Sequence, residues 1–145
     1  MASPPSRLRL FTWEEAQRQI PAVEVALARA RAFALRLGEL ETRVDAIVAA
    51  HGEERVDSPQ NPDREAYWRL LAELRDVQAR LETSIEEIRF AGAEVKDLAQ
   101  GLVDFTAQRG EGELVYLCWK LGEPELSWWH PLEGGFAARK PRAEF

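Results

Sequence analysis

Two long stretches with apolar residues at helical spacing constrain the fold of this chain most. In the first stretch, apolar or small residues recur in alternate steps of three and four and end at a histidine: Val23, Ala26, Ala30, Phe33, Leu37, Leu40, Val44, Ile47 and His51. The second stretch repeats the pattern: Tyr67, Leu71, Leu74, Gln78, Leu81, Ile85, Ile88, Gly92 and Val95. Such a seam is typical of a helix that packs along its length on another helix. We therefore expect two helices of about 30 residues, each ~45 Å long, folded back on each other as an antiparallel, coiled-coil-like hairpin.

The ends of these helices carry local signals. Thr12, with Glu15 three residues later, forms a capping box that starts the first helix. Pro21 lacks a backbone N–H and clashes with the preceding turn, so we expect a kink or a break near residue 20. The polar stretch 53–60 predicts a connecting loop, and Asn61, a favoured cap, predicts the start of the next helix.

After residue 92 the apolar spacing changes from helical to alternating. Between residues 114 and 121, one face would carry Val115, Leu117, Trp119 and Leu121, and the other face Tyr116, Cys118 and Lys120. A turn at 122–124 and renewed alternation over 126–130 predict a β-hairpin, and 94–97 and 102–105 are candidates for further short strands. Because two strands alone are marginally stable in water, we expect the hairpin to gain strands or to pack on the helices.

These elements predict an α+β fold. It consists of a kinked N-terminal helix, a long antiparallel helical hairpin and a small C-terminal antiparallel β-sheet. The length of 145 residues suits one domain, 1–145, with a helical part over about 12–92, a β part over about 93–138 and flexible ends.

Composition excludes several classes of protein. The net charge is −6 and no long segment is basic, which disfavours binding to nucleic-acid phosphates. One cysteine, Cys118, excludes an intrachain disulfide framework and fits a reducing compartment. No apolar run approaches the ~20 residues of a membrane span, and residues 1–7 lack the apolar core of a secretory signal. We therefore expect a cytoplasmic protein that binds neither membranes nor nucleic acid.

The last third of the chain contains a series of short motifs. They are Lys96-Asp97-Leu98, Gly101-Leu102-Val103-Asp104-Phe105, Leu117-Cys118-Trp119, Gly122-Glu123, Trp129-His130, Gly135-Phe136 and Arg139. This pattern resembles an uncharacterised bacterial family, with plastid-like relatives, that is known only as a domain of unknown function. The opening at 11–16 resembles that family as well, although Thr106 stands where its pattern has proline. The resemblance implies a long helical hairpin with a small β unit, and it implies no activity.

The residues that carry the resemblance also form a candidate pocket of charged groups among aromatic ones. They are Asp97, Asp104, Cys118, Glu123, Trp129, His130 and Arg139. A cysteine with a histidine is the minimum for a thiol nucleophile, but a small buried Cys118 and a His130 bonded to backbone explain the pair as well. Turn length decides whether the two share a face. One cysteine and scattered acids lack the paired spacing of a zinc site, so we assign no catalytic residue, no metal and no cofactor.

Two functions remain open on the sequence alone. The first is a non-enzymatic assembly or adaptor protein, a homo-oligomer or a binder of a protein partner, because the long seams leave apolar surface uncovered. The alternative is a small-molecule-binding protein or an enzyme, with the candidate pocket at the junction of sheet and helices.

Overall fold

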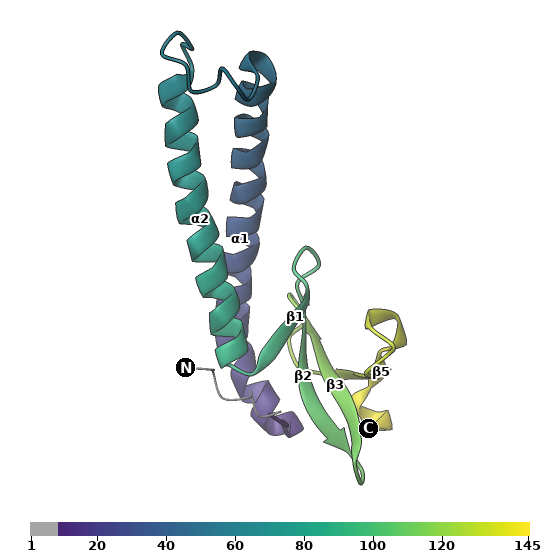
Figure 1. Ribbon diagram of the computed structural model, residues 1–145. Helices are drawn as coiled ribbons and strands as arrows, with labels where there is room; N and C mark the ends of the chain where they lie inside the picture. Colours follow the sequence, from purple (N-terminus) through teal and green to yellow (C-terminus); the bar gives the residue numbers. More distant parts are fainter. Residues whose placement is uncertain (1–8) are drawn as a thin grey trace, which may run out of the picture. The chain divides into compact units, whose positions relative to one another are not determined.

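The computed structural model describes residues 9–145 of the chain, which form two α-helices, a five-stranded sheet and two short 3-10 helices (Figure 1). The elements are α1 (Trp13–His51), α2 (Arg64–Phe90), β1 (Ala93–Asp97), β2 (Leu102–Arg109), β3 (Glu113–Lys120), β4 (Trp128–Pro131), η1 (Phe136–Ala138), β5 (Lys140–Pro141) and η2 (Arg142–Glu144). The α+β class predicted from the sequence is confirmed. The expectations for residues 1–7 and for a flexible N-terminal end concern residues outside the described part. None of the described helices combines the length and apolarity that a bilayer crossing requires.

The chain divides into two compact units. Unit 1 comprises the chain up to Ala28 together with Ile85–Phe145, and unit 2 comprises Arg29–Ser84. Both helices therefore contribute residues to both units, while the whole sheet belongs to unit 1.

The helix α1 begins as the capping signal predicts, since the Thr12 hydroxyl accepts the Glu15 amide at 3.1 Å. It then continues through Pro21 to His51. Of the two outcomes expected at this proline, a break does not occur. Ile20 and Val23, on either side of it, are buried in the core of unit 1, and this burial offsets the cost of about 3 kcal/mol for an internal proline.

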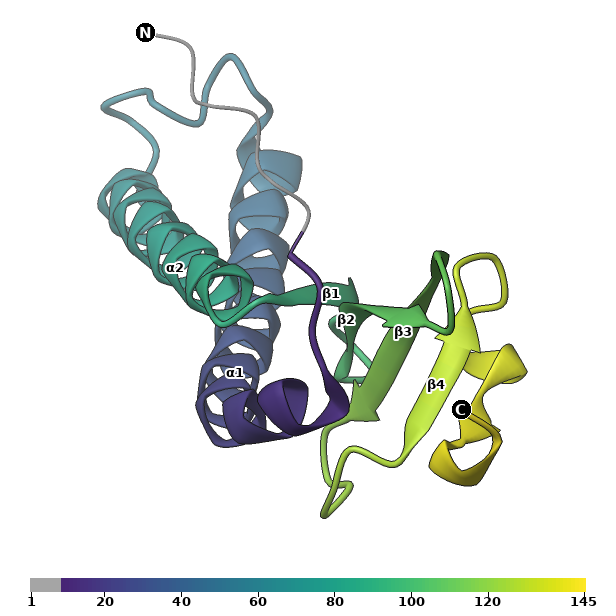
Figure 2. The ribbon, with the colours of Figure 1, turned by 90° about the horizontal axis from the view of Figure 1, so that it is seen from below.

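In unit 2, α1 and α2 lie side by side in both views (Figures 1 and 2). Leu40, Leu70 and Val77 are buried between them, and five apolar side chains are only partly buried around these three: Phe33, Leu37, Val44, Ile47 and Leu74. The first predicted seam thus contributes to this thin core, but the two most buried residues of α2, Leu70 and Val77, lie beside the second predicted seam rather than on it. In the connecting segment, the buried Asn61 amide donates to the Val56 carbonyl at 2.7 Å, and its oxygen accepts the Asp63 amide at 2.8 Å.

In unit 1, the five strands form an antiparallel sheet in the order β1-β2-β3-β4-β5. Alternation divides the side chains between two faces, as predicted for β3. The inner face carries Val103, Phe105, Ala107, Val115, Leu117, Trp119 and Trp129. These residues share one core with the first part of α1, including Trp13, Ala16 and Ile20. About seven buried apolar positions on one face are sufficient to hold the sheet against the helix.

The outer face of the sheet carries the polar residues. Asp104 on β2 lies opposite Cys118 on β3, and His130 on β4 lies opposite Tyr116 on β3. The chain after β4 returns beside it, because β5 pairs with β4 and the Arg142 amide donates to the Ser127 carbonyl at 2.9 Å (Figure 2).

Candidate functional site

Three buried side chains that could bind a ligand meet on the outer face of the sheet. Asp104, Cys118 and His130 come from three consecutive strands, and their ligand-type atoms all lie within 4.8 Å of one another. All three are 2–3 % exposed. Asp104 pairs with Cys118 and His130 pairs with Tyr116, so the His130 and Asp104 side chains reach each other diagonally across β3 on the outer face.

The contacts of His130 determine which of its ring nitrogens donates a hydrogen bond. His130 Nδ1 lies 2.7 Å from the Pro131 carbonyl oxygen, which only accepts, so Nδ1 must donate. In a neutral ring, Nε2 then carries a lone pair, and it lies 3.0 Å from Asp104 Oδ2. Two lone pairs repel, so a proton must lie between these atoms in the metal-free protein. The other carboxylate oxygen, Asp104 Oδ1, is buried and has no hydrogen-bond partner among the described residues.

The three side chains open into a cavity of about 120 Å³. Its other lining residues are Lys96, Leu102, Tyr116, Leu132, Gly135 and Phe136. The cavity therefore has a charged floor on the sheet and a mostly apolar rim from the segment that follows β4. Its volume equals that of about four waters.

Burial also changes the acidity of the two ionisable groups on β2 and β3. It raises the pKa of the Asp104 carboxyl, and the nearby His130 ring opposes this shift. It raises the pKa of the Cys118 thiol to about 12, with a further contribution from the negative charge of Asp104. Cys118 is therefore a protonated thiol at neutral pH rather than a thiolate paired with imidazolium.

Beside this cluster, Arg139 and Glu123 form a largely buried ion pair. Arg139 Nη2 donates to Glu123 Oε1 at 2.6 Å and to the Cys118 carbonyl at 3.3 Å. Glu123 Oε1 also accepts the Lys120 amide at 2.6 Å. Arg139 Nε is the second buried side-chain atom of the described chain without a partner. The pair fixes the end of the segment after β4 onto β3.

Two of the seven candidate residues lie elsewhere. Asp97 ends β1, where its Oδ1 accepts the Gln100 amide at 2.9 Å in a turn. Trp129 faces the inner side of the sheet, next to Leu117. The sequence had also suggested a pocket at the junction with the helices, whereas the cluster lies on the face turned away from α1.

Sequence reasoning missed the apolar rim of the cavity. Leu102 and Leu132 line it, and both read as ordinary apolar residues in the sequence, whereas Phe136 belongs to the aromatic residues that could form a ligand platform. One signal was present for Tyr116, because alternation places it on the same face as Cys118.

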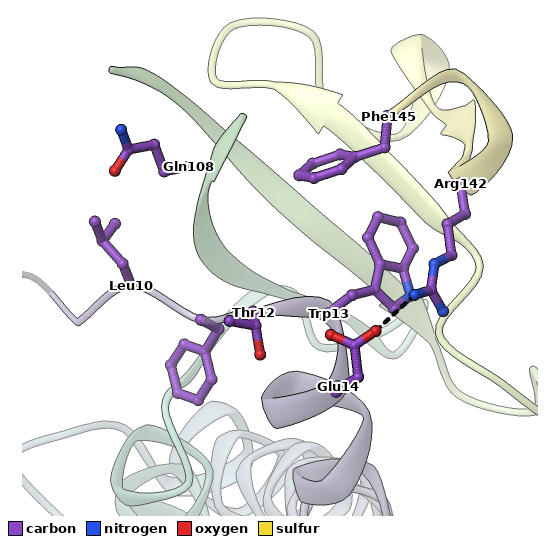
Figure 3. Close-up of a pocket in the computed structure, with 8 residues that line it drawn as sticks. Leu10, Thr12, Trp13, Glu14, Gln108, Arg142 and Phe145 are labelled. Atoms are coloured by element: carbon purple, nitrogen blue, oxygen red, sulfur yellow. Dashed lines mark hydrogen bonds and ion pairs between the residues drawn. The ribbon is translucent and has the colours of Figure 1, made fainter. Parts of the chain in front are cut away.

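A wider hollow of about 550 Å³ lies where the start of α1 meets the C-terminal segment (Figure 3). Trp13 and Phe145 contact there edge to face, with ring centroids 5.3 Å apart. Glu14 and Arg142 form an ion pair of 2.8 Å at its margin, and both side chains are more than half exposed. No buried titratable group lines this hollow, so it offers less specific chemistry than the smaller cavity.

Comparison with known proteins gives a family and nothing closer. No curated protein and no solved structure matches this chain. A family model described as an uncharacterized conserved protein (DUF2203) matches residues 9–142, which is nearly all of the part that the structure describes. The chain therefore belongs to this family, as the motifs in its last third had suggested.

Proposed function

We propose that this protein binds a small polar ligand in the cavity on the outer face of its sheet. One observation carries the proposal: the cavity floor holds a buried carboxyl group, contacted by His130 and the Cys118 thiol, of which one oxygen, Asp104 Oδ1, has no hydrogen-bond partner in the described chain. A buried acceptor without a partner costs about 1–3 kcal/mol. Groups of this kind are uncommon in folded proteins, and a bound ligand is one way to satisfy them.

The geometry favours binding over covalent catalysis. A cysteine nucleophile needs a thiolate and a free imidazole nitrogen beside it. Here the pKa of the Cys118 thiol is about 12, and both nitrogens of His130 are already in contact with Pro131 and Asp104. Proton transfer by His130 would require the contact with Asp104 to open.

NMR spectroscopy tests the proposal with probes that fit a volume of four waters, namely acetate, acetamide, urea and ethylene glycol. We expect at least one probe to shift the amide signals of Asp104, Cys118 and His130 saturably. Leu102→Phe adds volume to the cavity wall and should weaken this response. Thr106→Val lies on the same face of β2 but outside the cavity, and should leave it unchanged. Probes that shift none of these signals, or an equal response in the Leu102→Phe protein, would contradict the proposal.

A second candidate function rests on unit 2. We also propose that its two helical segments form a coiled-coil-like antiparallel hairpin through which the cytoplasmic protein assembles with itself or with a partner, and that α1 bends near Pro21, outside this unit. Its support is the thin core described above together with exposed apolar side chains: Leu35 is 70 % exposed and Trp68 47 %. Exposed apolar surface of this kind favours association.

The mass of the protein in solution tests this second function. Light scattering after gel filtration should give a dimer or larger species at micromolar concentration. Leu35→Glu should shift it towards the monomer, whereas Ala32→Glu adds the same charge at another exposed position of α1 and should have less effect. A monomer at every concentration would exclude self-assembly.

A further inference from the structure

We infer that the ligand of this cavity is a first-row transition metal ion, foremost Zn²⁺, held by Asp104, Cys118 and His130 with one coordination position open to the cavity. The inference deepens the proposed function and depends on it, because it names the class of ligand for the same site.

The three ligand atoms are already gathered. In a tetrahedral zinc site with bonds of about 2.0–2.3 Å, neighbouring ligand atoms lie roughly 3.3–3.7 Å apart. His130 Nε2 and Asp104 Oδ2 are 3.0 Å apart, and no separation among the three atoms exceeds 4.8 Å. Closing the longest separation takes at most about 1 Å, which side-chain rotation at Cys118 or Asp104 supplies.

The tautomer of His130 is the one that a metal ligand needs. Its Nδ1 donates to the Pro131 carbonyl, which leaves the lone pair of Nε2 directed at Asp104. Histidine ligands usually donate their second nitrogen to a backbone carbonyl or a carboxylate, and this bond fixes the ring. The backbone of β4 thus holds the imidazole in the orientation for metal binding.

A proton between Nε2 and Oδ2 would satisfy this contact in the metal-free protein, but it would not satisfy the whole site. Asp104 Oδ1 would keep no partner although the residue is 3 % exposed. A metal ion bound through one oxygen of the carboxylate lowers the cost of the unpartnered oxygen, because its positive charge also attracts this other oxygen, which is not a ligand. The orphan oxygen is therefore an observation separate from the clustering of the three residues.

The donor set selects the kind of ion. One sulfur, one imidazole nitrogen and one carboxylate oxygen suit Zn²⁺ or Co²⁺, while Mg²⁺ and Ca²⁺ prefer sites made only of oxygen. As the metal–sulfur bond forms, the thiol proton of Cys118 goes to the solvent, and so does any proton held between His130 and Asp104. The thiolate and the carboxylate then balance the two positive charges of the ion.

Two neighbouring cations act on Asp104 and Cys118, but each of them is paired with an acidic side chain. Lys96 lines the cavity, but its ammonium group lies 3.2 Å from Glu94, and Arg139 is paired with Glu123. Three protein ligands with an open position are the arrangement of catalytic zinc sites, whereas structural zinc usually has four protein ligands. The cavity of about 120 Å³ leaves room for the ion together with water or a small molecule at that position.

The test uses Co²⁺ alone as the probe, added to the full-length protein after removal of metal with a chelator. We expect one equivalent of Co²⁺ to produce the visible bands of a tetrahedral site and the near-ultraviolet band of a sulfur–cobalt bond. Asp104→Asn, Cys118→Ser and His130→Gln should each weaken binding at least tenfold, and Cys118→Ser should abolish the sulfur band. Circular dichroism checks that each variant folds.

The chain offers a matched control in its only other histidine. His51 Nε2 lies 2.9 Å from Asp63 Oδ2, yet this pair is partly exposed and has no cysteine beside it. His51→Gln should leave the Co²⁺ spectrum unchanged. A readout that needs no variant is X-ray absorption of the Zn²⁺-loaded protein, which should find one sulfur at about 2.3 Å and nitrogen or oxygen at about 2.0 Å.

The possible outcomes separate this inference from the proposed function. A protein without either Co²⁺ band, or one whose binding survives all three substitutions, overturns the metal site. If that protein still binds one of the small NMR probes at the cavity, the proposed function stands and only the class of ligand is wrong. A protein that binds neither Co²⁺ nor the probes loses both.

Discussion

Replacing Arg139 with glutamine should destabilise unit 1 far more than removal of an exposed arginine. Arg139 and Glu123 are 2.6 Å apart, and their side chains are only 11 % and 23 % exposed. Breaking a fully buried ion pair costs about 3–5 kcal/mol, because one charge is left without a partner. Arg139 also lies 5.0 Å from the ring centroid of Trp128 and 4.8 Å from that of Phe136. Each such contact adds about 0.5–1 kcal/mol at a partly exposed site.

With partial exposure of Glu123 taken into account, we expect the free energy of unfolding to fall by about 3 kcal/mol. For a chain of this length that corresponds to a loss of roughly 6–12 °C in Tm. Urea unfolding followed by tryptophan fluorescence is the suitable assay, because four of the five tryptophans belong to unit 1. In a double-mutant cycle with Glu123→Gln, the two changes should show a coupling energy of about 2 kcal/mol.

The control is Arg80→Gln on α2. Arg80 Nε lies 3.0 Å from Asp76 Oδ2, but both side chains are more than 60 % exposed, so we expect a change below about 0.5 kcal/mol. If Arg139→Gln had an effect no larger than Arg80→Gln, or if the cycle gave no coupling, the ion pair would not be what holds the segment after β4 onto the sheet.

Three further predictions concern acidity and backbone conformation. Because burial raises the pKa of the Cys118 thiol to about 12, the metal-free folded protein should react slowly with a thiol reagent at pH 8 and quickly in urea, and fast labelling without urea would refute this. Hydrogen bonds from Trp68 and then Arg64 hold the pKa of Asp57 below its ordinary value of 3.8, so the stability that they add is present above that pH and is lost as the pH falls through the lower folded value. Trp68→Phe should raise the pKa of Asp57 in an NMR titration, and an unchanged value would show that the indole bond has no influence. Gly92→Ala should cost more than about 2 kcal/mol in urea unfolding, since φ is +98° there and the new methyl group would overlap the Phe11 ring; near-native stability would refute it.

The secondary structure could be predicted from the sequence because the spacing of apolar residues is unambiguous in both parts. In unit 2, Leu40 and Leu74 of the predicted seams lie in the core, but the most buried residues of α2, Leu70 and Val77, stand one position before the seam positions Leu71 and Gln78. The alternation in β3 placed Leu117 and Trp119 on the same face, and the structure shows that this face is buried. The first strands were harder, since a fully buried run such as Leu102–Phe105 shows no polar alternation and reads only as a candidate.

The sequence predicted the types of residue in the candidate site, but it could not predict which of the candidate residues come together. Trp129 and His130 are neighbours in the chain, so they lie on opposite faces of the same strand, and a shift of one residue in register would exchange them. The turn between β3 and β4 decides that register, and its geometry could not be derived from Gly122 and Pro124 alone. Asp97, a plausible pocket acid by composition, is instead used in a turn.

The same register explains why sequence reasoning assigned no metal. Zinc motifs are recognised by ligands a few residues apart on one segment, whereas Asp104, Cys118 and His130 are separated by spans of 13 and 11 residues. In an antiparallel sheet the intervening residues form a turn and lead the chain back along the next strand. Residues that are distant in the sequence therefore come close together on one face of the sheet. A search for ligand sites in a sheet should therefore compare positions on the same face of consecutive strands rather than spacing along the chain.

The division of the sheet into two faces also shows how the fold tolerates an unsatisfied buried carboxylate. The inner face holds the large side chains Phe105, Leu117 and Trp119, each fully buried against the helix, and this burial stabilises the strands. The backbone of β2 is therefore held whether or not Asp104 on its outer face is satisfied. Because Asp104 follows Val103 and precedes Phe105, the residues that fix the strand and the residue that carries the chemistry alternate along one chain segment. The free-energy cost of the unsatisfied oxygen on the outer face can persist only where apolar burial on the inner face stabilises the strand by more. That condition is met at the centre of the sheet, where β2, β3 and β4 pair.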